Sequence, residues 1–140
     1  MGASALTFAP MGALDGAAER DLATIRRPRV DVADYAAAVA ERRVGACAIR
    51  ADGARVGTLI YGVELDADGR RVLVVRELAG RAPGVSLTEA TDAAVDQLGA
   101  RHECALARAA TYRPGLVRRL KGWRRRADGA RWWIEREIEA

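Results

Sequence analysis

The segment from residue 81 to residue 86 contains residue types that can bind an anion. It reads Arg-Ala-Pro-Gly-Val-Ser, follows an apolar run at 71–78 and precedes a helical pattern at 87–98. A strand, a turn with glycine and a helix start present backbone N–H groups, and the helix dipole favours negative charge there. The candidate phosphate-binding residues are Arg81, Gly84, Val85 and Ser86. The alternative is an ordinary helix start in which Ser86 is only the N-cap.

Two glutamates lie in apolar runs and are candidate general bases. Glu64 and Glu77 could each accept a proton from an amine if burial raised the carboxyl pKa. The alternative is that they are strand residues facing solvent or an arginine, and Arg76 is adjacent to Glu77. His102 is expected at a helix end rather than in chemistry, since it stands between a helical pattern and an apolar run.

The cysteines and the histidine do not have the spacing of a metal site. Cys47 and Cys104 are the only cysteines, each lies in an apolar run, and His102 is the only histidine. Ligands of a structural metal site come in closer groups than this. The sequence therefore predicts reduced, buried thiols and no metal.

The elements that would position these residues alternate between helical and strand patterns. Asp31 is a candidate N-cap for a helix at 32–43. The pairs Asp52-Gly53 and Asp68-Gly69 are hairpin turn signals. They separate three expected strands, at 45–50, 55–66 and 70–78. Further expected elements are a helix at 86–101, a strand at 104–111, a helix at 115–121 and a final hairpin at 122–126 and 131–138. In residues 1–30 only a short strand near 5–8 and a weak helical pattern at 12–25 can be read.

This order of elements resembles the GNAT superfamily of acyl-CoA-dependent N-acyltransferases over about residues 31–138. In that family the loop after the fourth strand has the pattern R/Q-x-x-G-x-G/A, and here Arg81 and Gly84 match it, with Ser86 at the last position. The late Gly-Phe of the family is similar to Gly122-Trp123. The resemblance implies an α+β fold with a mixed, mostly antiparallel sheet flanked by helices. The length of the chain predicts a single domain of residues 1–140.

The resemblance also implies a function. Acetyl-CoA or another acyl-CoA would contact Arg81, Gly84, Val85 and Ser86, and the acyl group would pass directly to an amine, with Glu77 or Glu64 as base. The chain departs from the family at two places. Pro83 removes a backbone N–H from the loop, and Arg118 stands where the family often has a tyrosine acid. The alternative is a non-catalytic subunit of a larger assembly with protein partners, such as a phage-like particle.

The C-terminal part of the chain is basic. The formal net charge is +4, with 22 arginines and one lysine. The late cations are Arg113, Arg118, Arg119, Lys121, Arg124, Arg125, Arg126, Arg131 and Arg136. They could contact nucleic-acid phosphates, an acidic protein or only solvent. The consecutive Trp132 and Trp133 would point to opposite faces of a strand. Trp132 is expected in the core, because it shares a face with Ile134.

No apolar run reaches the ~18 residues that span a bilayer. The sequence predicts no membrane partner and a cytoplasmic protein, or a virion-associated one under the assembly alternative.

Overall fold

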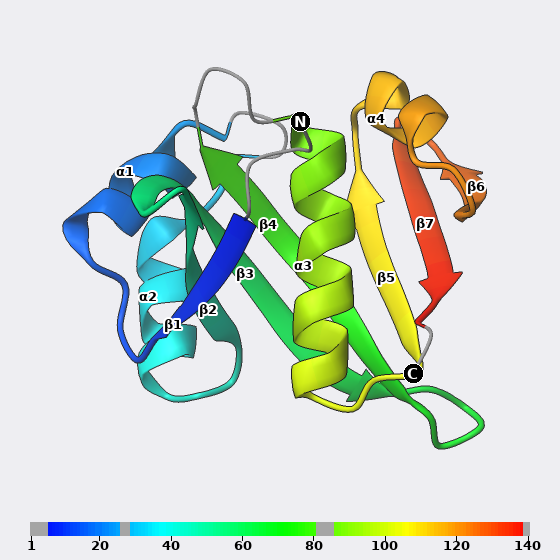
Figure 1. Cartoon of the computed structure of the whole chain (residues 1–140), viewed down its shortest axis with the longest axis horizontal. Helices are drawn as coiled ribbons and strands as arrows, with labels where there is room; N and C mark the ends of the chain where they lie inside the picture. The colour runs from blue at the N-terminus through cyan, green and yellow to red at the C-terminus, as the bar shows by residue number, and fades with distance from the viewer. Residues whose placement is uncertain (1–5, 26–28, 81–85, 139–140) are drawn as a thin grey trace. The chain divides into compact units, whose positions relative to one another are not determined.

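The computed structural model describes residues 6–25, 29–80 and 86–138 and has four helices and seven strands in them. The strands are β1 (Leu6–Met11), β2 (Gly45–Ala51), β3 (Ala54–Leu65), β4 (Arg71–Gly80), β5 (Leu106–Thr111), β6 (Arg124–Asp128) and β7 (Arg131–Glu137). The helices are α1 (Gly16–Ala23), α2 (Val32–Ala40), α3 (Leu87–Arg101) and α4 (Pro114–Arg119) (Figure 1). Every element that the sequence predicts between residues 31 and 138 is present, with ends shifted by a few residues.

The strands form one sheet in the order β1-β2-β3-β4-β5-β7-β6. The pairs β1–β2, β2–β3, β5–β7 and β6–β7 are antiparallel, and β4–β5 is parallel. The parallel pairing joins Val72–Val75 to Leu106–Ala109, and β4 then continues to Gly80. The predicted mixed, mostly antiparallel sheet of an α+β fold is confirmed.

The chain divides into two compact units. The first unit contains Met1–Gly62 and Glu77–Val85, and the second contains Val63–Arg76 and Ser86–Ala140. The strands β3 and β4 each contribute residues to both units.

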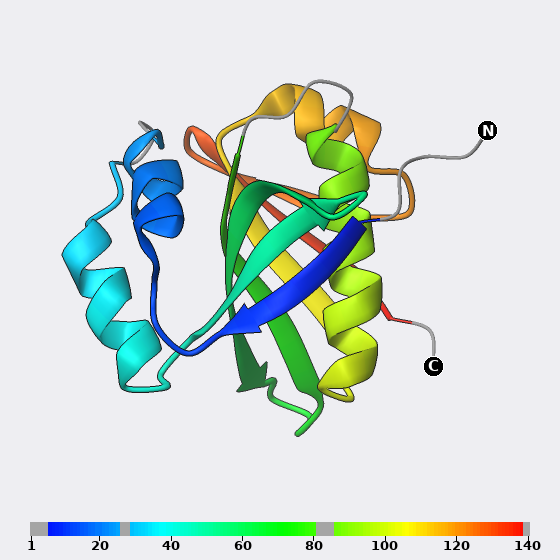
Figure 2. The same cartoon turned by 60° about the vertical axis from the view of Figure 1, so that its left-hand side comes forward.

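In the first unit, α1 and α2 cover one face of the strands. Leu22 of α1, Val39 of α2, Ala46 of β2 and Ile60 of β3 form one buried cluster. Figure 2 shows the two helices on the same side of β2 and β3. The strands β3 and β4 approach closely here, because a Cβ at Gly57 would collide with the Ala79 carbonyl oxygen. Since α1 and β1 belong to this cluster and sheet, residues 6–25 are an integral part of the fold.

In the second unit, α3 buries an alanine-rich face and lies along β5 (Figure 1). Val72 and Val74 of β4 form a cluster with Leu106 of β5. All four residues of the run 72–75 are buried, as expected for a strand covered on both faces. Among the described helices, none is long and apolar enough to cross a membrane.

The local signals have the expected physical basis. Asp31 accepts a hydrogen bond from the Asp34 N–H at 3.1 Å and caps α2. The Asp52-Gly53 turn has φ of 51° and 83°, the positive values that a tight hairpin requires. At the second turn, Asp66 rather than Asp68 is the organising side chain, since its Oδ1 accepts from the Asp68 and Arg70 N–H groups.

The prediction for the tryptophans is wrong about which indole enters the core. Trp123, after α4, is buried at 8% exposure and donates Nε1–H to Asp92 Oδ1 at 3.0 Å. Trp132 and Trp133 are both half-buried. Ile134 is buried, as the alternation along β7 requires, but the edge strand β6 is fully exposed and does not cover Trp132.

Candidate functional site

Glu77 lies in the first unit, where it is half-buried on β4. The hydroxyl of Tyr35, on α2, donates to Glu77 Oε2 at 2.8 Å. Tyr35 itself packs against the buried cluster of this unit, so its ring is held from several sides. A hydrogen bond from a phenol gives a carboxylate oxygen a defined direction. The arrangement can therefore present a positioned proton acceptor. The sequence analysis missed Tyr35, because the two residues are 42 positions apart and no spacing rule connects them.

Glu64 has a different environment. Its carboxylate accepts from Arg76 Nη2 at 3.0 Å, and both side chains are exposed. This is the ion-paired surface arrangement that the sequence analysis kept as its alternative. Between the two candidate bases, Glu77 is the one with partial burial and an orienting partner.

Ser86 is the N-cap of α3, and its side-chain oxygen accepts from the Glu89 N–H at 3.0 Å. The other predicted phosphate-binding residues, Arg81, Gly84 and Val85, lie outside the described residues. Both interpretations of this segment require the cap. The helix start leaves its first N–H groups without intrahelical partners, and these groups can serve an anion. Glu89 adds an acidic side chain to the first turn.

A polar network ties α1 to β3 in the first unit. Arg55 donates to both carboxylate oxygens of Asp15, at 2.6 and 3.0 Å, and to Thr58 Oγ1 at 3.2 Å. Buried Thr58 donates in turn to Asp21 at 2.7 Å. The Arg55 hydrogen bond, followed by the Ala18 N–H, holds the pKa of Asp15 below its ordinary value. Arg55 Nε is buried without a hydrogen-bond partner among the described residues, but the other polar groups of the network bind one another, so we assign it to stability.

His102 and Cys104 stand at the end of α3. His102 is the C-cap and half-buried, as expected for a helix end. Burial, followed by the charges of Arg101 and Arg71, lowers its pKa. Burial raises the pKa of the Cys104 thiol. Cys47 and Cys104 are both buried, as predicted, and no disulfide joins them. Within the described residues, no group of His, Cys, Asp or Glu could hold a metal ion.

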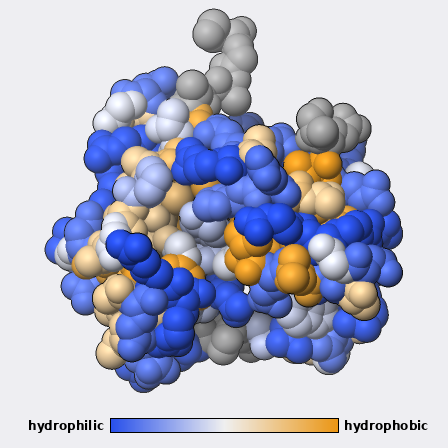
Figure 3. Space-filling view, turned by 90° about the horizontal axis from the view of Figure 1, so that it is seen from below, coloured by the Kyte–Doolittle hydropathy of each residue, from blue (hydrophilic) through white to orange (hydrophobic). Residues whose placement is uncertain are grey.

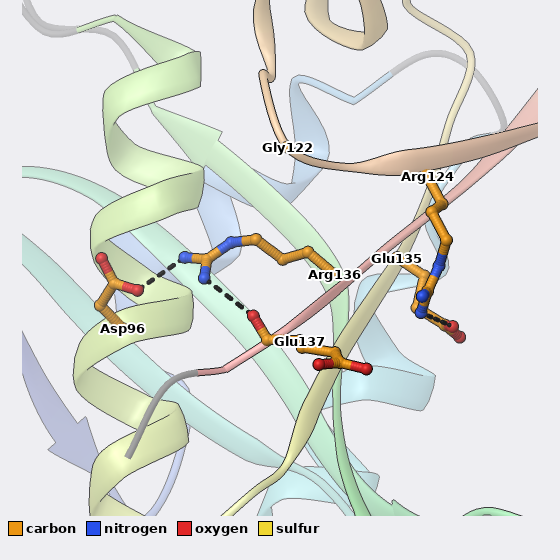
Figure 4. Close-up of a pocket in the computed structure, with 6 residues that line it drawn as sticks. All are labelled: Asp96, Gly122, Arg124, Glu135, Arg136 and Glu137. Carbon is orange, nitrogen blue, oxygen red and sulfur yellow. Dashed lines mark hydrogen bonds and ion pairs between the residues drawn. The ribbon is translucent and has the colours of Figure 1, made fainter.

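A charged hollow of about 550 Å³ lies in the second unit, between α3 and the β6–β7 hairpin (Figure 4). Arg136 Nη2 donates to Asp96 at 2.6 Å, and Arg124 donates to Glu135 at 2.7 Å. None of the residues predicted to bind acyl-CoA or to act as a base lines it, although Arg124 and Arg136 belong to the late cations. Most of its charges neutralise one another, so the hollow offers a ligand little uncompensated charge.

No family model matches the sequence, and a search of curated proteins finds no match. Solved structures do resemble the fold. An acetyltransferase from Thermus thermophilus has a TM-score of 0.59 at 16% identity, over 99% of this chain and 100% of that one. The PaiA N-acetyltransferase of Thermoplasma acidophilum, in complex with coenzyme A, has 0.56 at 10% identity, over 96% and 99%.

A third similar structure is a chain of the NatC complex bound to a Gag peptide and CoA. Its TM-score is 0.66 at 11% identity, over 96% of this chain and 99% of that one. At these identities the likeness concerns the fold, and it covers more of the chain than the residues 31–138 over which the sequence shows the resemblance. The chain therefore has the fold of the GNAT superfamily.

Proposed function

We propose that this protein is an acyl-CoA-dependent N-acyltransferase that moves an acyl group directly to an amine. The observation that supports this most is the likeness of fold over nearly the whole chain to acetyltransferases, including structures bound to CoA. Acetyl-CoA or another acyl-CoA is the proposed cofactor. When bound, it would supply the acyl group as a thioester, whose carbonyl carbon an amine can attack.

The proposed cofactor contacts are Arg81, Gly84, Val85 and Ser86, which precede α3 in the sequence. The donor set suits a pyrophosphate, since it combines a guanidinium, loop N–H groups and a capped helix start. Ser86 supports this role by holding the Glu89 N–H at 3.0 Å, which orders the first turn of α3.

Glu77 is the proposed general base. Glu77 would accept the proton that the attacking amine loses, and CoA would leave as its thiolate. Tyr35 would keep Oε2 in a fixed direction through its 2.8 Å hydrogen bond. Arg118 cannot replace the tyrosine acid that the family often has, because a guanidinium does not give up its proton in proteins.

The assembly-subunit alternative has less behind it. The similar structures named above are acetyltransferases or CoA-bound, and none of them supports a phage-like particle. The face shown in Figure 3 is mainly hydrophilic, with small hydrophobic patches.

Calorimetric titration with acetyl-CoA tests the cofactor. The unchanged protein should bind it, and Gly84→Asp should weaken binding at least tenfold, because it places a carboxylate where the pyrophosphate would lie. Gly12→Asp is the matched control, since it adds the same side chain at an exposed site where a Cβ meets nothing within 4 Å. An absence of heat at millimolar acetyl-CoA would overturn the proposal.

Glu77→Gln separates binding from turnover. The variant should bind acetyl-CoA as the unchanged protein does, while consumption of acetyl-CoA with a panel of primary amines should fall at least 100-fold. Unchanged turnover would remove Glu77 from the mechanism without affecting the cofactor assignment.

A further inference from the structure

Positive charge is concentrated in one stretch of the second unit. Residues 113–131 contain eight cations and one acid, a formal charge of +7, whereas the whole chain carries +4. The rest of the chain is therefore at −3. This segment of 19 residues changes the net charge of the chain from negative to positive. The positive charge is therefore localised and is not a general property of the composition.

Two of these cations are neutralised locally, and six are not. Arg124 pairs with Glu135 at 2.7 Å, and Arg131 pairs with Asp128 at 2.6 Å. The other six are exposed and form no ion pair with any part of the chain that the structure describes. They are Arg113, Arg118, Arg119, Lys121, Arg125 and Arg126, and we call them the α4–β6 cationic surface. Figures 1 and 2 both place α4 next to the chain that enters β6.

The backbone that carries this surface is well anchored. Val117, Leu120 and Trp123 are buried beneath it. The β6–β7 hairpin is closed by Asp128, which accepts from Arg131 at 2.6 Å and from Trp133 Nε1 at 3.2 Å. Cations on an anchored scaffold lose little conformational freedom on binding, apart from that of their own side chains.

The chemistry of the surface selects its partner. The centre of a protein–protein interface is apolar, but the large apolar side chains Val117, Leu120 and Trp123 of this segment are buried. The large exposed hydrophobic residue among those described is Leu65, at 70%, on β3. A second copy is disfavoured, because pairing at the edge strand β6 would bring two rows of arginines together. Five of the six cations are arginines, which bind phosphate in a bidentate manner.

An aromatic platform accompanies the arginines. In the β6–β7 register, Arg126 lies opposite Trp133, and Ala127 lies opposite Trp132. Both indoles are half-buried and lie on opposite faces of β7, and the Arg131 guanidinium lies 4.8 Å from the centre of the Trp133 ring. Cations that follow a phosphate backbone, next to aromatic rings that can stack on bases, are the usual means of binding single-stranded nucleic acid. We propose that the α4–β6 cationic surface binds single-stranded RNA or DNA through its phosphates.

Fluorescence anisotropy of labelled mixed-sequence RNA and DNA strands, about 16 nucleotides long, tests this proposal. The full chain should bind at ~50 mM salt, and the logarithm of its affinity should fall linearly with the logarithm of salt concentration. Arg125→Gln/Arg126→Gln removes two contacts, so the slope should become shallower by about 1.4. Arg118→Gln/Arg119→Gln is a second variant on α4 that should behave alike, and it keeps the test valid if the first fails to fold. Stronger binding of one strand type identifies the natural class.

Arg20→Gln/Arg43→Gln is the matched control, because both residues are exposed cations of the first unit and the change in net charge is the same. This control variant should leave the slope of affinity against salt concentration unchanged. A decrease in slope as large as that of the other double variants would show that binding depends only on net charge. An absence of binding at ~50 mM salt would also overturn the proposal. Competition by polyglutamate as effective as that by an oligonucleotide of equal charge would point to an acidic protein instead.

Discussion

At the scale of single residues, the start of α3 combines a favourable cap with an unfavourable charge. Ser86 holds the Glu89 N–H at 3.0 Å, whereas the Glu89 carboxylate adds negative charge to the first turn. An acid in this position stabilises a helix through the dipole but repels an anion bound there. The same side chain should therefore affect folding and cofactor binding in opposite directions.

Glu89→Gln tests this opposition. The free energy of unfolding should fall by about 0.3–1 kcal/mol, while acetyl-CoA affinity should rise about two- to fivefold, both from the dipole and charge terms. Urea denaturation and calorimetric titration at low salt measure the two effects. Asp92→Asn is not a suitable control, because Asp92 accepts from Trp123, so Glu103→Gln, an exposed acid past the other end of α3, serves instead. A loss of affinity in Glu89→Gln would place the anion elsewhere.

Hydrogen bonds between residues close in sequence could be predicted from the sequence. Hydrogen bonds between residues far apart in sequence could not. The caps Asp31 and Ser86 follow from a side chain that reaches an N–H three residues ahead. Tyr35 and Glu77, in contrast, are joined only by the tertiary fold. The same holds for Arg55 and Asp15, which are 40 positions apart.

At the scale of elements, Glu135 of β7 connects both neighbouring strands. Its Oε2 accepts from Arg108 of β5 at 2.8 Å, and its Oε1 accepts from Arg124 of β6 at 2.7 Å. Burial by itself would raise the pKa of Glu135, but the hydrogen bonds and charges of the two arginines outweigh burial and lower it. The charged form is therefore stabilised by folding.

A carboxyl whose pKa is lower in the folded state stabilises the protein above its unfolded pKa, and this contribution disappears as pH falls through the folded value. Glu135→Gln should therefore be less stable than the unchanged protein at pH 7, by about 1 kcal/mol given its partial exposure. The gap should close as pH falls below about 4.3, the ordinary glutamate value. Urea denaturation from pH 7 to pH 3 measures it.

Glu41→Gln is the control for this prediction. Glu41 and Arg43 form a pair that is about 60% exposed on both sides, so its loss should change stability by less than about 0.5 kcal/mol at any pH. A Glu135→Gln deficit that persists at pH 3 would mean that the side chain acts through packing rather than charge.

Element types were predictable, because the periodicity and turn residues agree. The two Asp-Gly turns separated β2, β3 and β4, although Asp66 rather than Asp68 organises the second. Trp123 could not be identified from the sequence as the buried indole. Alternation along β7 predicts the face of the sheet on which a side chain lies, but not how deeply it is buried. Its burial depends on α4 and on Asp92 of α3, which no strand pattern reveals.

At the scale of the whole molecule, the order of elements was enough to predict the fold, since few topologies accommodate a meander, a parallel crossover through α3 and a final hairpin. The order of elements does not predict whether the two units unfold together in one cooperative transition or separately. A single domain of residues 1–140 stays a prediction. It has a direct test, because Trp123, Trp132 and Trp133 all belong to the second unit.

Tryptophan fluorescence therefore reports the second unit, and far-UV circular dichroism reports both. Because β3 and β4 each run through both units, we expect one cooperative transition, with the two signals melting together. The variant Leu22→Ala tests this expectation. Leu22 is fully buried in the first unit, and its truncation should lower the free energy of unfolding by about 2–5 kcal/mol. If folding is cooperative, the tryptophan Tm should fall by roughly 10 °C although the change lies in the other unit. Leu65→Ala, at an exposed site, should leave both signals unchanged. A fluorescence transition that stays in place while the dichroism of Leu22→Ala melts earlier would show two independently folding units.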